Sequence, residues 1–385
     1  MKNQKNTISW KLLAAIITFA AIAPSVLMTA PVLASQLAVQ LKLDEVQIGY
    51  LFMAELGAMS LATLPAYWWL TNCNRKNVAR ISAIIFFLGN ITSTFFDSYL
   101  LLLLTRFITS LAGGSLMILC ISSASNTDNP SRIYGFWVLG QLILGALGLL
   151  VLPVLFNFFG LKIVYIILAI LIALCFPLTS AFSSDPSDYQ DQTNTLNAIK
   201  VPFYATLFSI TGVLLFYIGL SGIWTFMGKI AEEIVKISPT ETGEILSIAT
   251  VLGIVGAGSA TLMGSYNKLN VLLWIGYGAM IISVALLIDT PSLFRFILAA
   301  FIFKFTWTFV LPFILGSIAE LDPTGKLMNT INLVIGGGTS MGPAIAGWLI
   351  KDLGGIETLI LFSIIALGGS MFFILFTRSK YKKIT

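Results

Sequence analysis

The sequence predicts an all-α membrane protein with twelve transmembrane helices, arranged as two six-helix bundles related by a parallel repeat. Three observations support this fold class: the composition, the spacing of apolar runs, and a similarity between the two chain halves. Of the 385 residues, 57% are hydrophobic and only 10% are charged, whereas a soluble domain carries roughly 25% charged residues. A globular fold cannot hide this much apolar surface behind a polar exterior, so the excess must face lipid.

Twelve apolar stretches are long enough to cross a bilayer, because a membrane-spanning helix needs roughly 20 residues for a hydrocarbon core of about 30 Å. The runs are continuous rather than alternating, which favours helices over a β-barrel. The first stretch is longer than a span requires, and its Pro24 and Pro31 are candidate kink positions. The twelve predicted spans are 11–39, 45–69, 79–96, 98–125, 132–157, 161–182, 201–230, 239–264, 268–288, 291–318, 325–350 and 355–377.

Cysteine and histidine usage argues against metal and disulfide chemistry. The three cysteines, Cys73, Cys120 and Cys175, form no disulfide pattern. Histidine is absent, which removes imidazole ligands and histidine proton relays. No nucleophile–base arrangement stands out either, so we predict neither an enzyme nor a bound cofactor or metal.

The placement of lysine and arginine predicts that both termini are cytoplasmic. Fourteen of these residues fall on the side of the termini, five on the other side and three inside predicted helices; cytoplasmic loops carry the excess of positive charge. The net charge of +5 therefore reflects topology, and we predict no nucleic-acid partner. The inner group is Lys2, Lys5, Lys11, Arg75, Lys76, Arg80, Arg132, Lys200, Lys268, Lys326, Arg378, Lys380, Lys382 and Lys383; the outer group is Lys42, Lys162, Lys229, Lys236 and Lys351.

A cleaved signal peptide is an alternative interpretation of the N-terminus, which has lysines, an apolar run and a small-residue stretch at 30–34. The length of the apolar run, and the repeat described next, favour a retained membrane span. We therefore expect a multi-pass protein of the inner (plasma) membrane of a bacterium, with the lipid bilayer as its surroundings.

The second and eighth predicted helices begin alike, at segments 42–49 and 236–243, which are offset by 194 residues. Each start fits a capping box, in which an N-cap side chain and an acidic or amide side chain three residues later satisfy each other's backbone N–H groups. A glycine follows in each helix, where it permits close helix approach. The capping pairs are Asp44 with Gln47 and Ser238 with Glu241, the glycines are Gly49 and Gly243, and the same offset relates Arg132 to Lys326, Gly148 to Gly342 and Gly160 to Gly354.

Several matches at one offset indicate duplicated halves in parallel orientation. We predict an N-terminal six-helix bundle at 1–182 and a C-terminal six-helix bundle at 201–385. The polar stretch 183–200, with three aspartates and no apolar periodicity, is the predicted cytoplasmic linker.

The segment from Arg106 to Gly114 in the fourth predicted helix is an arginine followed by small residues and glycines. Together with twelve spans, a parallel repeat and a polar central loop, it resembles the major facilitator superfamily over the whole chain. Ser110 stands where that superfamily more often has glycine.

Two local motifs depart from the superfamily pattern. In the loop after the second helix, Arg75 and Lys76 match the basic part, but Tyr67 and Thr71 replace the usual glycine and aspartate, so the associated gating salt bridge is not carried over. The Gly-Pro pair that drug antiporters have in the fifth helix is missing between 140 and 148, while a Gly-Pro occurs in the eleventh, at 342–343.

The resemblance implies a secondary active transporter working by alternating access. Helices one, four, seven and ten would line the central cavity, and helices two, five, eight and eleven would form the moving contact between halves. No ATP-binding motif is present, because the glycine-rich stretch 336–347 follows no strand and lacks the Gly-Lys-Ser/Thr ending. We therefore expect a proton-coupled transporter of a small organic solute that works as a monomer.

Three ionisable residues lie deep in predicted helices, where a charge costs at least ~2.5–3.5 kcal/mol. At 1.5 Å per residue, Glu55 is roughly 15 Å deep, Arg106 about 12 Å and Lys304 roughly 20 Å. For Lys304 the functional interpretation is a carboxylate anchor or a titrating coupling group, and the structural one is a lysine paired with a carboxylate or with backbone carbonyls.

Glu55 and Arg106 also have two interpretations. Glu55 fits a proton carrier and Arg106 fits anion binding or charge compensation, but the two also fit a structural ion pair within one half. The three residues sum to +1, and complementarity then favours an anionic substrate. The candidate polar and aromatic residues of the rest of the pocket are Gln141, Tyr217, Trp224, Trp307, Asn329 and Asn332.

Two alternatives to an organic-anion transporter stay open. Proton-antiport efflux of drugs or amphipathic metabolites predicts cationic or neutral hydrophobic ligands and dependence on Glu55. A membrane sensor or assembly partner that kept the fold predicts no substrate flux at all.

Overall fold

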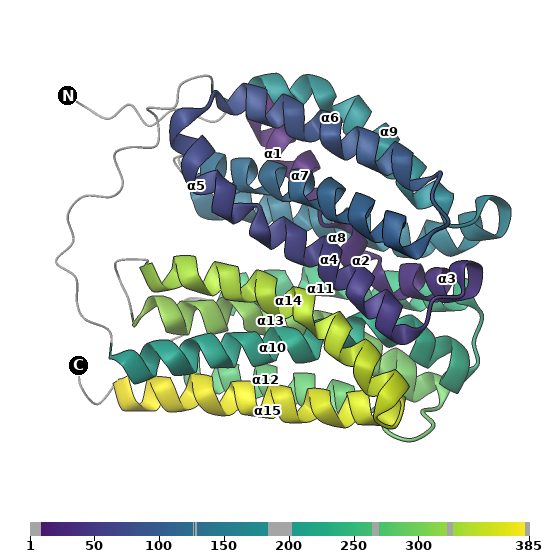
Figure 1. Cartoon of the computed structure of the whole chain (residues 1–385). Coiled ribbons are helices and arrows are strands. Elements are labelled where there is room, and N and C mark those ends of the chain that lie inside the picture. Colours follow the sequence, from purple (N-terminus) through teal and green to yellow (C-terminus); the bar gives the residue numbers. More distant parts are fainter. Residues whose placement is uncertain are drawn as a thin grey trace. The chain divides into compact units, whose positions relative to one another are not determined.

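Helices form almost all of the described part of the chain, which in this computed structural model comprises residues 9–125, 127, 129–183, 202–263, 269–321 and 326–381, apart from the side chains of 131, 326, 329 and 381. No strand occurs among these residues (Figure 1). The helices are α1 Trp10–Ile22, α2 Ser25–Met28, α3 Ala30–Leu41, α4 Glu45–Leu61, α5 Thr63–Asn72, α6 Arg75–Ser93, α7 Tyr99–Ser125, α8 Pro130–Phe159, α9 Lys162–Cys175, η1 Phe176–Ala181, α10 Phe203–Lys229, η3 Ile230–Val235, α11 Pro239–Met263, α12 Leu269–Ala285, α13 Leu293–Ala319, α14 Lys326–Asp352 and α15 Ile356–Tyr381.

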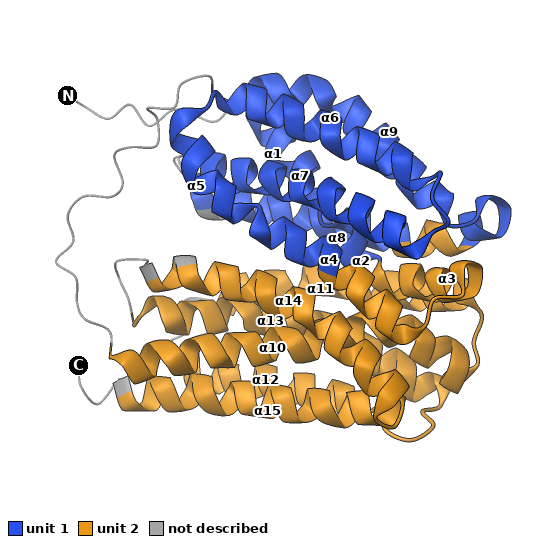
Figure 2. Cartoon of the chain, in the orientation of Figure 1, with its two compact units in different colours: residues 1–29, 54–148, 154–194 blue, residues 30–53, 149–153, 195–385 orange. Residues whose placement is uncertain are grey.

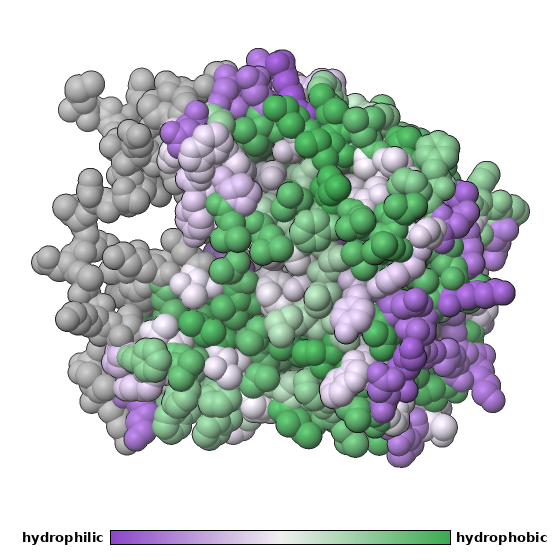
Figure 3. Space-filling model, in the orientation of Figure 1, coloured by the Kyte–Doolittle hydropathy of each residue, from purple (hydrophilic) through white to green (hydrophobic). Residues whose placement is uncertain are grey.

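The all-helical membrane fold is confirmed, while the count of twelve spans stays a prediction. Within the described residues, nine helical segments are long and apolar enough to cross a membrane. The other three predicted spans correspond to α1–α3, to α6 and to the 17-residue α12. Figure 3 shows hydrophobic residues covering much of the helix surface, with many hydrophilic residues gathered near helix ends.

The first predicted span is broken, as its prolines suggest. Helix α1 ends at Ile22, and Pro24 precedes the single turn α2. Pro31 is the second residue of α3, a position where its missing N–H costs no helical hydrogen bond. The break lets the two parts of this segment belong to different packing units.

The chain contacts divide the protein into two units (Figure 2). Unit 1 comprises 1–29, 54–148 and 154–194, and unit 2 comprises 30–53, 149–153 and 195–385. Unit 2 thus combines the second predicted half with α3 and the start of α4. The predicted bundle boundaries at 182 and 201 lie at or within the undescribed segment 184–201 and stay a prediction.

Both capping boxes form as predicted. Gln47 N–H donates to Asp44 Oδ1 at 2.9 Å, and Asp44 N–H donates back to Gln47 Oε1 at 3.1 Å. Glu241 N–H donates to Ser238 Oγ at 3.2 Å, and Ser238 N–H donates to Glu241 Oε2 at 2.9 Å. Equivalent local chemistry therefore starts α4 and α11, the helices that the sequence repeat relates.

Close helix contacts repeat at the same offset of 194 residues. A Cβ at Gly49 would lie 2.5 Å from the Pro343 carbonyl oxygen, and a Cβ at Gly243 would meet the carbonyl oxygen of Leu149. Gly49 and Gly243 are related by the offset, and so are Leu149 and Pro343. All four belong to unit 2, so these contacts join segments of the two predicted halves.

A second pair of contacts follows the repeat, one in each unit. In unit 1, a Cβ at Gly114 would lie 2.8 Å from the Cβ of Ala62; in unit 2, a Cβ at Gly256 would lie 2.6 Å from Thr308 Oγ1. The offset of 194 relates Ala62 to Gly256 and Gly114 to Thr308. Small residues at equivalent places thus allow the same helix approach in both units, as duplicated halves require.

Candidate functional site

Lys304 lies in the interior of unit 2, on α13, with only 1% of its surface exposed. Its ammonium nitrogen is 3.6 Å from the ring centroid of Trp224 on α10 and 4.3 Å from that of Trp307, one helical turn further along α13. A cation within about 6 Å of an aromatic centroid is attracted by the negative face of the ring. The structure thus brings together three residues that the sequence analysis had selected separately.

Phe303 completes this aromatic group, which we call the Lys304 box: Trp224, Phe303, Lys304 and Trp307. The Trp224 and Phe303 rings are stacked, with their centroids 6.3 Å apart and an angle of 8° between the ring planes. The centroid of Trp307 lies 6.1 Å from each of them. Trp307 meets both rings edge-on. These are the favoured geometries of aromatic pairs, so the box is a well-packed and pre-formed group.

The ammonium group of Lys304 makes neither an ion pair nor a hydrogen bond with a described residue. All five ion pairs found there involve other residues. A charge at the centre of a membrane protein is usually paired or lines a functional site. Desolvated cation–π contacts contribute about 2 kcal/mol or more, and they offset part of the several kcal/mol that desolvation of an ammonium group costs.

Glu55 and Arg106 form a buried ion pair in unit 1. Arg106 Nε donates to Glu55 Oε1 at 2.6 Å, and the side chains are 1% and 3% exposed. The pair joins α4 to α7. The sequence had left this pairing as one of two interpretations for Glu55, and the geometry confirms that the two side chains meet.

Two further residues surround Arg106. Its Nη1 donates to Asn90 Oδ1 on α6 at 2.9 Å, and the guanidinium carbon lies 4.8 Å from the ring centroid of Tyr165 on α9. Asn90 in turn donates to the Phe86 carbonyl at 2.8 Å. Four helices therefore contribute to this group, which we call the Arg106 cluster: Glu55, Asn90, Arg106 and Tyr165.

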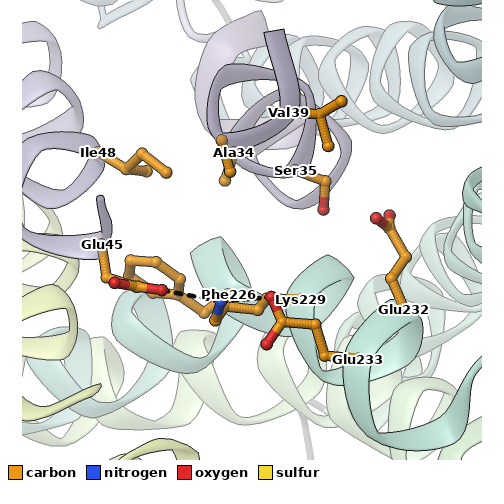
Figure 4. A pocket seen from close by; sticks show the side chains of 10 residues that line it. Ala34, Ser35, Val39, Glu45, Ile48, Phe226, Lys229, Glu232 and Glu233 are labelled. Carbon is orange, nitrogen blue, oxygen red and sulfur yellow. Dashed lines mark hydrogen bonds and ion pairs between the residues drawn. The ribbon is translucent and has the colours of Figure 1, made fainter. Parts of the chain in front are cut away.

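Unit 2 contains a set of ion pairs near helix ends, which we call the outer ion pairs after the side that the predicted topology gives them. Lys229, the last residue of α10, pairs with Glu45 at the start of α4 at 2.8 Å, and also with Glu233 in η3 (Figure 4). Lys351 near the end of α14 pairs with Asp44 at 2.8 Å. The Lys229–Glu45 and Lys351–Asp44 pairs link segments of the two predicted halves.

A cavity of about 60 Å³ adjoins Lys229 and is lined by α3, α4, α10 and η3. Figure 4 shows Ser35 and Glu232 pointing toward each other from α3 and η3. Neither Ser35 Oγ nor Glu232 Oε1 forms a hydrogen bond of normal geometry with a described residue. The cavity has room for small polar species next to the ion pairs.

The Asp44 carboxyl is the acidic partner of Lys351. Partial burial raises its pKa, but the hydrogen bond from Lys351 and those from the backbone of α4 outweigh this, so the net pKa lies below the ordinary value of 3.8. The Asp44–Lys351 attraction is therefore fully present above that value.

The remaining predicted site residues lie apart from the Lys304 box. The Gln141 amide donates to the Ala20 carbonyl at 3.0 Å in unit 1. Tyr217 is buried against Phe216 in unit 2. Asn332 is exposed, and the side chain of Asn329 lies outside the description.

The residues predicted for the gating loop begin α6. Asn74 caps this helix by accepting from the Asn77 N–H at 3.2 Å. Arg75 is buried and Lys76 is partly exposed. Their role in gating stays a prediction.

Asn90, Tyr165 and the outer ion pairs were not predicted from the sequence. An asparagine inside the apolar stretch 79–96 was a usable signal, because a polar side chain in a membrane helix usually has a partner. Tyr165 and Glu45 gave no comparable signal, since tyrosine and helix-end carboxylates are common in membrane proteins.

A bundle of membrane-length helices with buried charged side chains is typical of membrane transporters. A family model for the Major Facilitator Superfamily matches residues 13–327. The chain therefore belongs to the Major Facilitator Superfamily.

Solved structures of transporters share the fold over nearly the whole chain. A variant of the nucleoside transporter NupG is 17% identical with a TM-score of 0.74, and the alignment covers 96% of this chain and 99% of NupG. The POT family transporter PepTSo is 13% identical with a TM-score of 0.74, covering 96% and 98%. A bacterial homologue of the human lysosomal transporter Spinster is 14% identical with a TM-score of 0.64, covering 96% and 95%. No curated protein matches the chain significantly.

Proposed function

We propose that this transporter moves a small organic anion across the membrane by alternating access, driven by the proton gradient. The observation that carries the proposal is the Lys304 box, in which a buried ammonium group has no carboxylate partner among the described residues. An anionic group on a substrate would supply the missing counter-charge. The indole faces of Trp224 and Trp307 would supply apolar contact area beside it.

The net charge of the buried groups favours an anion over a cation. Glu55 neutralises Arg106 inside unit 1, so the positive charge of Lys304 is left uncompensated among the three residues. A cationic drug would meet this ammonium group with like-charge repulsion. Organic-anion transport is thus favoured over efflux of cationic drugs.

Glu55 is the residue that we propose for proton coupling. It is a carboxylate at membrane depth, and its Oε2 has no hydrogen-bond partner among the described residues. Such an oxygen can accept a proton while the other oxygen keeps its contact with Arg106.

The proposed topology follows from charge placement. Both termini face the cytoplasm of a bacterial cell, and the Asp44–Lys351 and Glu45–Lys229 pairs lie on the opposite side. The protein works as a monomer, with the two sequence halves moving against each other.

The test is a thermal-stability panel on purified protein with organic anions, organic cations, sugars and amino acids. A ligand at a hundred times its dissociation constant stabilises by ~2.7 kcal/mol. We expect stabilisation by organic anions and its loss in Lys304→Met. Stabilisation by lipophilic cations that survives Lys304→Met would overturn the anion proposal and favour drug efflux.

A further inference from the structure

Among the described residues of unit 1, Arg106 contacts three side chains, and of these Glu55 can lose its charge. Glu55 Oε1 is 2.6 Å from Nε, Asn90 Oδ1 is 2.9 Å from Nη1, and the Tyr165 ring faces the guanidinium at 4.8 Å. The carboxylate changes charge when it binds a proton. The amide oxygen and the ring face stay as they are in that event.

The free oxygen of Glu55 offers a proton site in this cluster. Glu55 is 2% exposed, and its Oε2 lacks a hydrogen-bond partner among the described residues. A buried carboxylate oxygen without a partner is costly. A proton bound there removes the charge of Glu55 and leaves the Arg106–Oε1 hydrogen bond in place.

Protonation of Glu55 creates a second cost, because the Arg106 guanidinium stays charged at any attainable pH. A buried cation that has lost its counter-charge is strongly destabilised. Asn90 Oδ1 still accepts a hydrogen bond from this cation, and Tyr165 still presents its negative ring face. With the carboxylate neutral, they are the electron-rich contacts left to the guanidinium among the described residues, so they stabilise the protonated state more than the ionised state, in which Glu55 already balances the charge.

We propose that Asn90 and Tyr165 are positioning residues that keep Arg106 stable after Glu55 binds a proton, and that they thereby set the pH at which Glu55 is protonated. One proton enters, binds Oε2 of Glu55 and later leaves from the same atom; Arg106 keeps its own protons throughout. This inference deepens the proposed function, since it rests on Glu55 as the coupling residue. The helices that contribute the four residues, α4, α6, α7 and α9, are labelled in Figure 1.

Among the described residues, the charged or titratable groups that interact with Glu55 from neighbouring helices are Arg106 and Tyr165. Arg106 comes from α7 and Tyr165 from α9, while α6 contributes the neutral Asn90. Phenols ordinarily titrate near pH 10 and guanidinium groups above about 12. The titration that tests the assignment of proton binding to Glu55 therefore runs between pH 4 and 9, below the ordinary ranges of the phenol and the guanidinium.

The test is infrared difference spectroscopy of the purified full-length protein in lipid nanodiscs, titrated across that pH range. The Glu55 carboxyl band is the one that Glu55→Gln removes. Asn90→Leu and Tyr165→Leu each take one neutral partner from Arg106, so both are expected to move the midpoint to lower pH by about tenfold in proton concentration. Tyr165→Phe keeps the ring face and is expected to leave the midpoint within about threefold of the wild type.

Tyr277→Leu is the matched control for loss of a buried tyrosine. Tyr277 lies in unit 2, is fully buried and bonds to Ser370 Oγ at 2.7 Å. Its loss lowers stability but is expected to leave the Glu55 midpoint unchanged. A shift in Tyr277→Leu equal to that in Tyr165→Leu would mean a general effect of destabilisation and would overturn the inference.

Two other outcomes overturn it. One is a Glu55 band whose midpoint is the same in Asn90→Leu, Tyr165→Leu and the wild type, and the other is a Glu55 that does not titrate in this range. The readout needs no substrate. A titration as expected, together with flux that ignores the proton gradient, would count against the proposed function and leave the positioning role of Asn90 and Tyr165 supported.

Discussion

Lys304 and the Glu55–Arg106 pair are both ionisable groups buried in membrane-length helices, but they are stabilised in different ways. Arg106 has a carboxylate, an amide oxygen and a ring face around it. Lys304 has two indole faces and, among the described residues, no negative partner. The partners of Arg106 account for its burial. Burial of Lys304 costs free energy that these contacts do not return, and a role in substrate binding would account for its presence.

The comparison predicts opposite effects of removing charge at the two places. Glu55→Ala leaves the Arg106 guanidinium buried without a counter-charge, and such a loss costs about 3–5 kcal/mol. We expect the largest fall in thermal midpoint among the substitutions considered. The double variant Glu55→Ala/Arg106→Leu is expected to recover most of the loss, and equal instability of the single and double variants would contradict the pairing account.

Lys304→Met removes an unpaired charge and fills the same space with an apolar side chain. Loss of the cation–π contacts costs about 2 kcal/mol or more, and relief of the ammonium desolvation, which is several kcal/mol, offsets this loss. The thermal midpoint without ligand is therefore expected to stay the same or rise. A fall as large as that of Glu55→Ala would indicate a structural role for Lys304.

The repeated glycine contacts can be tested on one helix. Gly243→Ala places a Cβ against the Leu149 carbonyl oxygen and 2.7 Å from Pro153 Cγ, whereas Gly258→Ala, also on α11, meets open space. Overpacking costs about 1–3 kcal/mol, so only Gly243→Ala should lower the thermal midpoint. Equal midpoints for the two variants would contradict the close contact.

The outer ion pairs are expected to have smaller effects. Lys229 and Glu45 are about four-fifths buried at their side chains, and partly exposed pairs contribute roughly 0.2–1 kcal/mol. Lys229→Ala should increase, about 1.5- to 5-fold, the reaction of a cysteine placed at Ser35 with an impermeant thiol reagent. The measurement uses a protein from which the native cysteines have been removed. A decrease in reactivity would contradict the role of Lys229 in holding these helix ends together.

The smallest effect is expected at Asp44 and Lys351, which are the more exposed pair. The pKa of Asp44 is lower in the folded protein, so its attraction to Lys351 is present above the ordinary value of 3.8 and is lost as pH falls through the lowered pKa. Relative to the same protein with Lys351 intact, Lys351→Ala should change the reactivity of the cysteine placed at Ser35 by the same factor at pH 5 and at pH 8. A strong dependence between those values would contradict this assignment.

The sequence was sufficient for the helical membrane fold, because apolar length, helix caps and glycine spacing are local signals. The capping box at Asp44 and the close contacts of Gly49 and Gly243 follow directly from them. The repeat offset of 194 residues also predicts which pairs of contacts recur. The break after α1 was indicated by Pro24.

The candidate sites were only partly predictable, because their partners come from distant segments. The depth of Lys304 was evident, but its contact with Trp224 depends on how α10 and α13 pack. Asn90 and Tyr165 reach Arg106 from α6 and α9, and nothing in their local sequence specifies that meeting. Conversely, Gln141 was selected for a pocket and instead bonds to a backbone carbonyl of α1.

The most direct test of the central claim is flux through the purified protein in liposomes. The substrate is the organic anion that stabilises the protein best. Its uptake would be measured with and without an imposed proton gradient, in the wild type, Lys304→Met and the control Lys351→Met. We predict gradient-driven uptake in the wild type and the control, and a loss of at least about tenfold in Lys304→Met, as for one charged contact worth 1.4 kcal/mol or more. Full anion flux in Lys304→Met would contradict the assignment of Lys304 as the substrate anchor.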